Sequence, residues 1–472
     1  MSKKLLALLL IVPMLLCCKG NTNDGHEQKP EEEGALEGEA YAKAAPMIKS
    51  GETYLVTNEN VEKFVTEVNY PDKDWSFTKI FDYYGGFDGK NFDWTHEPDS
   101  DKPNSFSIRW VANVDAGSLV LHLEDKLGWS ADTEMRTGSC FINITNLLPN
   151  DEYTYKVTAS NGDVMAEGNF KTTGHVHQVF FKTKCRNARD LGGWVTADGK
   201  KRIKFRKIYR GGRMNDPWDV MLSKEGRQEV KDEGIGAELE LRGSDDYMTE
   251  PAFKGLDHCH PCIEEGGKVM LGVTAPSAKN CMKWLVFDES SPWTAEQKAP
   301  FLKDDGKPDK TKIDDWLKKN TDRPSNQEYD AFQAAYKAKT KECFLFMLNS
   351  VKANKGVYFH CSLGRDRTGT MQILTMGILG VREGDIGKEY ELTYFAPVGY
   401  SVSSSDMATN PEPIFKNDRT HWVYSDVVPY FWSCSTDGTF YDGVRNYLLL
   451  TGVTQAQIDE FRSLMLEDVP AN

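Results

Sequence analysis

The sequence lacks an excess of positive charge. Its 472 residues include 57 lysines and arginines against 71 aspartates and glutamates, which gives a formal net charge of -14. Proteins that bind nucleic acid generally present a basic field, so this balance argues against a nucleic-acid partner. Hydrophobic residues make up 39% of the chain and aromatic residues 11%, which is enough to form cores, and the length predicts two or more domains.

Cysteine is also scarce, with ten residues in all. Those that follow the N-terminal apolar run are spaced irregularly for a disulfide scaffold, which a chain of this length does not need. Cys259 and Cys262 form a CxxC beside His258, but no second pair stands at the spacing of a zinc site. The pair therefore predicts a strand segment or one local disulfide, and we expect neither a metal nor another cofactor.

Long apolar runs are missing except at the N-terminus. Leu5–Leu16 is almost wholly apolar and follows Ser2–Lys4, a pattern typical of a bacterial export signal and too short to span a bilayer comfortably. Cys18 at its end resembles the modified cysteine of a lipoprotein. We therefore expect residues 1–18 to be a lipoprotein signal peptide and residues 19–47 a disordered tether. The expected location is the cell envelope of a bacterium, lipid-anchored to a membrane on its periplasmic or surface side.

Residues 48–175 alternate polar and apolar side chains, which predicts strands. The segments that carry this alternation are Ser105–Val111, Ser118–Leu123, Ser139–Ile144 and Tyr153–Val157. Leu147–Tyr155 is similar to the corner segment of fibronectin type III-like sandwiches, where a tyrosine hydroxyl bonds to nearby backbone. We predict an all-β sandwich. It is either a carbohydrate- or partner-binding module or a spacer, and the lack of a legible aromatic platform favours the spacer.

From residue 176 to residue 472 the pattern becomes mixed α/β. Expected strands are Val179–Phe181, Ile203–Tyr209, Ile235–Leu241 and Gly356–Phe359, and expected helices are Pro217–Glu233, Glu328–Lys352 and Thr368–Leu379. Residues 266–322 mix Lys, Asp and Pro, so we expect an irregular insertion over one face.

The segment His360–Gly369 reads HCSLGRDRTG, and Cys361 is the one cysteine with an arginine six residues on. A loop between a strand and a helix points backbone N–H groups and the positive helix end inward, which suits a dianionic phosphate and favours a thiolate. Arg367 offers a planar fork to two phosphoryl oxygens, and Gly364 permits a tight turn. Thr368 could donate its hydroxyl to the departing sulfur. These features predict a phosphomonoester hydrolase with a phosphocysteine intermediate. The other loop residues expected to bind phosphate or hold the loop are His360, Ser362, Leu363 and Arg365.

This loop resembles that of the atypical bacterial tyrosine-phosphatase family, which reads HCxxGKDRTG. Arg186–Gly193 is similar to the family's N-x-R-D-L-G-G segment, Ile208–Arg213 to Y-R-S-G-R, and Gly380-Val381 with Glu389–Thr393 to G-V…D-Y-x-L-S. The resemblance spans roughly residues 185–466. It implies an α/β cysteine-phosphatase fold, a central mixed sheet flanked by helices. It also implies that Arg189, Asp190 and Arg210 shape the pocket.

Two departures from the family pattern concern the site. Arg365 stands where the family has lysine, and Glu240 stands where it has the aspartate of D-L-R. The general acid is left open among Asp366, Glu240, Asp245 and Asp246, because sequence does not show which carboxyl reaches the leaving oxygen.

The substrate class also stays open. Family members often accept phosphoserine, phosphothreonine or phosphoinositides, so we expect a protein-tyrosine or dual-specificity phosphatase, with a phosphoinositide or inositol polyphosphate as the alternative. The basic run Lys200–Lys207 could attract such polyanions or could be a solvated hairpin face. A protein of another class, catalytically silent and binding a phosphorylated ligand, is disfavoured by the intact loop. The expected partners are thus a phosphorylated substrate and a membrane.

Overall fold

The computed structural model forms two compact units, each described separately below. The first contains the chain up to Val56 and Asn104–Gly174, and the second contains Thr57–Pro103 and the chain from His175 on. The described residues are 44–67, 100–111, 116–135, 139–182, 185–214, 222–242, 252–259, 278–287, 291–307, 309–319, 326–396 and 427–470. Among the helices in these ranges, none is both long and apolar enough to cross a bilayer.

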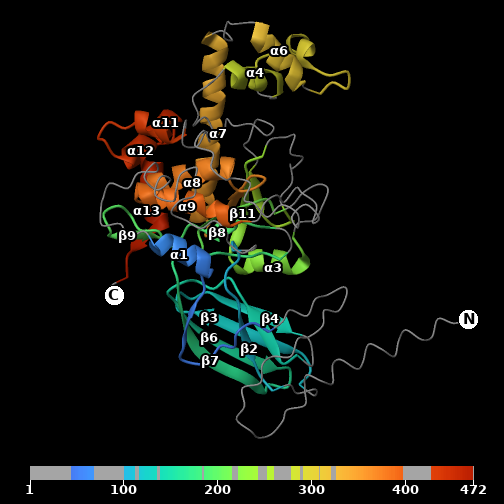
Figure 1. The fold of residues 1–472 in the computed structure, drawn as a ribbon, viewed down its shortest axis with the longest axis vertical. Helices are drawn as coiled ribbons and strands as arrows, with labels where there is room; N and C mark the ends of the chain where they lie inside the picture. The colour runs from blue at the N-terminus through green and yellow to red at the C-terminus, as the bar shows by residue number, and fades with distance from the viewer. Residues whose placement is uncertain are drawn as a thin grey trace, which may run out of the picture. The chain divides into compact units, whose positions relative to one another are not determined.

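The first unit is built from two sheets (Figure 1). The larger has the order β1-β7-β6-β3-β4 and the smaller pairs β2 with β5. Apolar residues at every second position of β3, namely Leu119, Leu121 and Leu123, are buried in a core shared by both sheets. The strand bounds are β1 Thr53–Leu55, β2 Phe106–Arg109, β3 Leu119–Asp125, β4 Ser130–Met135, β5 Phe141–Ile144, β6 Glu152–Ala159 and β7 Val164–Thr173.

The corner predicted at Leu147–Tyr155 is present. Tyr153 is 1% exposed and stacks on Phe170. Its hydroxyl accepts a hydrogen bond of 2.8 Å from the backbone N–H of the buried Leu148. The tyrosine therefore joins strand β6 to the turn that precedes it.

The second unit contains a mixed sheet in the order β12-β11-β13-β10-β8. Its first four strands are parallel and β8 is antiparallel to β10. Every residue of β13 is buried, as expected for a central parallel strand covered on both faces. The bounds are β8 Arg189–Asp190, β10 Ile208–Gly211, β11 Ile235–Glu240, β12 Asp257–Cys259 and β13 Gly356–His360.

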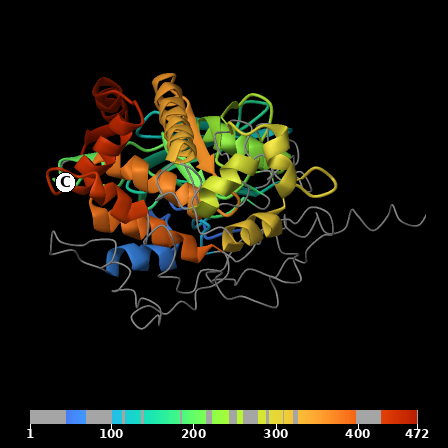
Figure 2. The same cartoon turned by 90° about the horizontal axis from the view of Figure 1, so that it is seen from above.

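Helices surround this sheet (Figures 1 and 2). The predicted helix at 328–352 is confirmed as α7, Asn326–Lys352, and the helix after the cysteine loop is α8, Asp366–Leu379. Both contribute to one core with the sheet. The other elements in this part of the chain are α3 Lys224–Asp232, α9 Glu383–Glu391, η5 Leu392–Phe395, α11 Val428–Ser433, α12 Phe440–Leu450 and α13 Gln455–Met465.

Three local predictions were wrong. Ile203–Tyr209 is not one strand, because Arg206 adopts a left-handed conformation (φ 58°) and separates β9, Lys201–Ile203, from β10. Strand β9 pairs instead with β14, Leu466–Asp468. Val179–Phe181 forms no strand, and helix α3 starts later than expected, at the cap residue Ser223.

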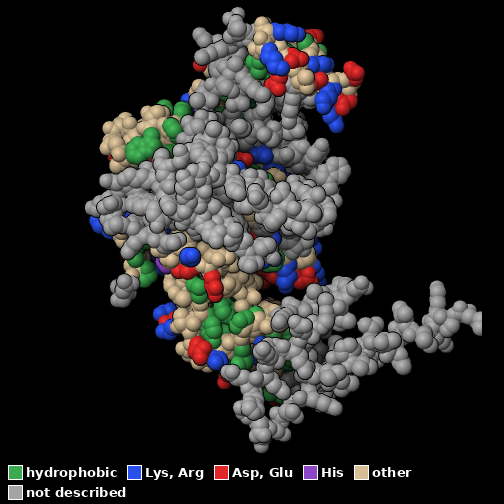
Figure 3. Space-filling model, in the orientation of Figure 1, with side chains coloured by type: hydrophobic (Ala, Val, Ile, Leu, Met, Phe, Trp, Pro, Cys, Tyr) green, Lys and Arg blue, Asp and Glu red, His purple; other side chains and the backbone are tan. Residues whose placement is uncertain are grey.

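The insertion was expected to be irregular, yet its described residues are largely helical. They form α4 Ala278–Phe287, α5 Ala295–Lys298, η4 Ala299–Phe301 and α6 Lys310–Lys319. Buried side chains such as Trp284 and Phe301 make a separate core with Phe332 and Tyr336 of α7. At about 1.5 Å per residue, α7 is about 40 Å long, so its other end reaches the main core. Lys, Arg, Asp and Glu side chains are interspersed over this insert (Figure 3).

One segment between the strands β1 and β2 belongs to the second unit, which sequence periodicity did not predict. Its helix α1, Glu59–Glu67, lies beside α9 in both Figure 1 and Figure 2. The buried ammonium group of Lys388 donates to the Val65 carbonyl oxygen. The predicted β domain over residues 48–175 is therefore interrupted at residues 57–103.

The corner gives a stability prediction. Tyr153→Phe removes the acceptor of the Leu148 N–H and leaves that buried donor unsatisfied, so the free energy of unfolding should fall by about 1 to 2 kcal/mol. Tyr155→Phe on the same strand is the matched control and should change it by less. Urea unfolding followed by fluorescence measures both, and equal effects of the two substitutions would contradict this role for Tyr153.

Candidate active site

Cys361 lies at the carboxyl end of the central strand β13, where parallel α/β sheets bind ligands. It is 4% exposed. The loop that follows ends at Arg365, and α8 begins at Asp366. The arrangement of strand, loop and helix N-terminus expected from the sequence is therefore present.

Gly364 allows the loop to fold against the neighbouring strand. Its φ is 76°, and a Cβ atom at this position would stand 2.5 Å from the backbone carbonyl of Gly211, at the end of β10. No other residue type fits there without moving backbone. The close approach brings the loop within reach of side chains from the strands on that side.

Several of those side chains bind the loop backbone. The Asn187 amide donates to the carbonyl oxygens of Leu363 and Gly364 at 3.2 and 3.3 Å. Arg210 also donates to the Gly364 oxygen. Arg213 binds Ser362 twice, through its backbone N–H to the carbonyl at 3.1 Å and through its guanidinium to the hydroxyl at 2.9 Å. Groups outside the loop thereby hold the carbonyl oxygens of Ser362, Leu363 and Gly364.

A single buried carboxylate organises this support. Glu389 on α9 is fully buried, pairs with Arg189 at 2.5 Å and pairs with Arg210 at 3.0 Å. Burial, followed by the nearby charge of Arg210, lowers the pKa of Arg189 to about 10, which leaves the guanidinium charged at neutral pH. Two cations on one anion leave net positive charge beside the loop.

These contacts revise the expected roles of three residues. Arg189, Asp190 and Arg210 are at most 3% exposed, and their described partners are protein atoms. Asp190 accepts from the Gly192 N–H at 2.8 Å and from the Arg206 N–H at 2.6 Å. The three residues shape the pocket by holding the backbone behind it, not by presenting charge to a substrate.

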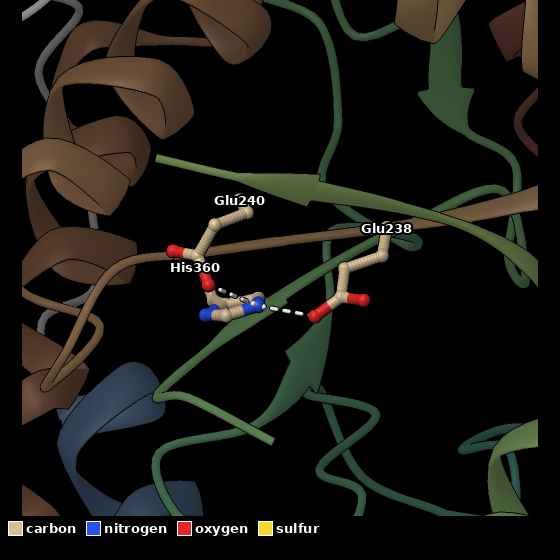
Figure 4. A group of neighbouring side chains, drawn as sticks. All are labelled: Glu238, Glu240 and His360. Atoms are coloured by element: carbon tan, nitrogen blue, oxygen red, sulfur yellow. Dashed lines mark hydrogen bonds and ion pairs between the residues drawn. The ribbon is translucent and has the colours of Figure 1, made fainter. Parts of the chain in front are cut away.

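Beneath the loop, His360 joins a second buried charge cluster (Figure 4). Its Nδ1 lies 3.0 Å from the Cys361 carbonyl oxygen and its Nε2 lies 2.8 Å from Glu238. Arg242 donates to Glu240 at 2.9 Å through Nε and at 2.6 Å through Nη2. His360 thus contacts the loop backbone at Cys361.

The trio Glu238, Glu240 and His360 has the donor atoms of a metal site, all within 4.8 Å of one another. Arg242 already supplies a cation to Glu240, however, and His360 supplies a donor to Glu238. The donor set therefore fits an internal ion network better than a metal centre.

The cluster shifts the pKa values of its members. Burial alone would raise the pKa of Glu238, but the adjacent His258 and His360 side chains lower it to about 2. For His360, burial opposes the charged form, yet the Glu240 charge and the hydrogen bond to Glu238 outweigh it and raise the pKa above 6.5. An imidazolium on Glu238 is thus favoured under Cys361.

Arg367 and Thr368 occupy the first turn of α8. Arg367 is 7% exposed, and its Nη1 lies 3.4 Å from the Leu241 carbonyl oxygen. The Thr368 hydroxyl is buried and has no hydrogen-bond partner among the residues that the structure describes. A buried unsatisfied hydroxyl costs free energy, so its presence at the loop suits a hydroxyl that bonds to a reacting group.

The candidates for the general acid differ in their surroundings. Glu240 is fully buried and bound by Arg242, which makes it a poor proton donor to a substrate. Asp366 has a side chain that is 44% exposed and lies 3.8 Å from the Arg365 guanidinium. Asp245 and Asp246 lie outside the described residues, as does Cys262, the second cysteine of the CxxC.

Part of the basic run is paired within its own unit. Lys201 pairs with Asp468 at 3.0 Å and Arg202 pairs with Glu467 at 2.7 Å across the β9–β14 ladder. The Lys204 ammonium donates to the carbonyl oxygen of Leu464. The carboxylates of β14 therefore offset two of the charges of the run.

Sequence reasoning missed four supporting residues: Asn187, Glu389, Glu238 and Asp101. The first two lie inside the family-like segments, so the segments signalled them without assigning a role. Glu238 stood out only as an acid in an apolar strand. For Asp101 the sequence carries no signal.

The Glu389 carboxylate yields a mutational prediction. Glu389→Gln leaves two buried guanidinium groups without their anion, so it should cost about 3 to 5 kcal/mol of unfolding free energy. Glu460→Gln, which removes the acid of an exposed pair with Lys352, should cost under about 1 kcal/mol. Denaturant unfolding compares the two, and equal costs would refute the role given to Glu389.

The raised pKa of His360 gives a pH dependence. The contribution of His360 to stability is present below its ordinary pKa of 6.5 and is lost as pH rises through the raised value. The stability gap between wild type and His360→Gln should therefore narrow with rising pH. Unfolding free energies between pH ~5.5 and ~9 test this, because Glu238 stays ionised throughout that window. A constant gap would show that the imidazole does not bind an extra proton on folding.

Comparisons with known proteins agree with this geometry. Residues 182–467 match the model of the tyrosine phosphatase family. Over 217 residues the chain is 24% identical to a protein of Cupriavidus necator that bears the name "Putative tyrosine-protein phosphatase", and the alignment covers 45% of this chain and 62% of that relative. Because the family model spans more than half of the 472 residues, the chain belongs to the tyrosine phosphatase family.

Proposed function

We propose that this protein is a phosphomonoester hydrolase that works through a phosphocysteine intermediate. The observation that carries the proposal is the loop itself. Cys361 follows a buried strand, Gly364 turns the loop back on Gly211, and α8 opens with Asp366 and Arg367. Backbone N–H groups at a helix N-terminus favour a phosphate dianion.

In the first step, the Cys361 thiolate would attack the phosphorus atom. The S–P bond forms, the ester P–O bond breaks, and the leaving oxygen takes a proton from a carboxylic acid. Arg367 would bind two of the phosphoryl oxygens through its planar fork. We assign the acid to Asp366, because its side chain is half-buried at the loop whereas Glu240 is bound by Arg242.

In the second step, a water molecule would attack the phosphorus atom. The S–P bond breaks, inorganic phosphate forms, and sulfur leaves as the thiolate. The buried Thr368 hydroxyl, which has no partner among the described residues, is suited to donate to that sulfur. The chemistry needs no metal.

For the substrate, we favour a phosphorylated protein over inositol polyphosphates and phosphoinositides. The enzyme would then be a protein-tyrosine or dual-specificity phosphatase. The reason is charge. Lys201 and Arg202 of the basic run at residues 200–207 pair with Asp468 and Glu467, which reduces the charge that this part of the run offers to a polyanion. An ester with one phosphate group needs only the loop and Arg367.

We also propose that the chain is lipidated at Cys18 and held at the bacterial cell envelope. The support is the sequence of residues 1–18, since those residues lie outside the described part. Substrates would then be met outside the cytoplasm.

Activity should depend on the two loop residues in different ways. Wild type should release phosphate from an aryl phosphate in a vanadate-sensitive reaction, and Cys361→Ser should abolish turnover while binding of vanadate or phosphate persists. Arg367→Lys should lose most activity, about 10²-fold or more, because a fork becomes a point charge. Turnover by Cys361→Ser at the wild-type rate would overturn the mechanism. Phosphate binding without turnover in the wild type would indicate a silent binding protein.

A panel of substrates separates the remaining alternatives. The mature protein without its signal should hydrolyse phosphotyrosine peptides with a higher kcat/KM than phosphoinositides or inositol polyphosphates. The reverse order would contradict the charge argument made from the paired basic run.

A further inference from the structure

Asp101 stands out because it lies outside the part of the chain that matches the tyrosine phosphatase family, yet contacts the loop's support. It belongs to the 57–103 segment, which precedes the family match at 182–467. Asp101 is 6% exposed. Its carboxylate accepts from the Arg186 guanidinium through both oxygens, and it accepts from the Asn187 backbone N–H at 2.7 Å. The three hydrogen bonds fix the position and orientation of this buried carboxylate.

Neighbouring bonds hold Asp101 itself in place. The carbonyl oxygen of Ser100 accepts from the Gln178 amide at 3.0 Å. The hydroxyl of Ser100 accepts from the Asn60 amide of α1 at 2.9 Å. Ser100, the residue next to Asp101, is thus bonded on one side to α1 and on the other to Gln178.

Asn187 connects Asp101 to the cysteine loop. Its φ is 59°, in the left-handed region that asparagine adopts more readily than other non-glycine residues. The Asp101 carboxylate accepts the N–H of this residue. In this conformation the Asn187 amide reaches the carbonyl oxygens of Leu363 and Gly364 in the cysteine loop.

A second route runs through Arg186. Its carbonyl oxygen accepts from the Gly212 N–H at 2.9 Å, and Gly212 follows the Gly211 carbonyl against which Gly364 is folded. Loss of Asp101 would also remove a carboxylate that is bound to the buried Arg186 guanidinium. The first route thus leads from Asp101 to Asn187, which binds the loop. The second route leads through Arg186 to Gly212, next to the carbonyl against which Gly364 is folded.

We propose that Asp101, which lies outside the residues that match the family, is a positioning residue for the phosphate-binding loop. It acts through Asn187 and does not touch the substrate. The proposal rests on the proposed function for its kinetic test, but its binding test does not require turnover.

The experiment is a double-mutant cycle in the full chain lacking its signal. Asp101→Ala should lower kcat/KM for an aryl phosphate about tenfold or more and weaken vanadate binding similarly, because it removes the acceptor of the Asn187 N–H and a carboxylate bound to Arg186. Asn187→Ala should have a comparable effect. The double variant should be little worse than Asn187→Ala alone, since the two act in series.

Asp101→Asn is the conservative variant. It also controls for a loss of activity that would come only from misfolding of Asp101→Ala. It keeps one acceptor oxygen for the Asn187 N–H, so it should retain more activity and vanadate affinity than Asp101→Ala. Additive losses in the double variant, or a lowered unfolding temperature with unchanged kcat/KM and vanadate affinity, would overturn the proposal.

The two proposals fail in distinguishable ways. If wild type hydrolyses the aryl phosphate and the Asp101 variants match it, the positioning role is wrong and the phosphatase function stands. If wild type shows no turnover, the function is wrong, and vanadate binding across the same variants still decides the role of Asp101.

Discussion

The site depends on one buried carboxylate that carries two arginines. Glu389 neutralises only one of the two charges on Arg189 and Arg210, so a net positive charge remains beside the loop. All three side chains are buried. Arg210 then fixes the carbonyl oxygen of Gly364, and Arg189 fixes the side chain of Asn187. The carbonyl oxygens of Ser362, Leu363 and Gly364 are bonded from outside the loop, an arrangement that suits N–H groups directed at a phosphate. Removing one charge from such a network is costly, because it leaves another buried charge unpaired.

A second cluster of buried charges lies beside Cys361. Glu238 and Glu240 are balanced by His360 and Arg242, so this cluster is nearly neutral. It contacts the Cys361 carbonyl oxygen through His360. Both clusters contact the loop backbone, and only the one around Glu389 carries net positive charge.

Local patterns were enough to predict the elements that carry the chemistry. Strand β13, helices α7 and α8 and the Tyr153 corner follow from runs of apolar residues and turn formers within a few positions. Arg206 broke a predicted strand because its left-handed backbone has no signature in the apolar pattern. The support of the loop depends on pairs far apart in sequence, such as Asp101 with Arg186 and Arg189 with Glu389. No periodicity reports such pairs, so the sequence did not show which groups Arg189 and Arg210 bind.

The most direct test of the account is to trap the covalent intermediate. Acid quenching during turnover of an aryl phosphate, followed by mass spectrometry of the peptides, should show one phosphoryl group on the peptide that contains Cys361. The same peptide from Cys361→Ser should carry none. Steady turnover by the wild type with no phosphoryl group on Cys361 at any quench time, or with the group on another residue, would contradict the account.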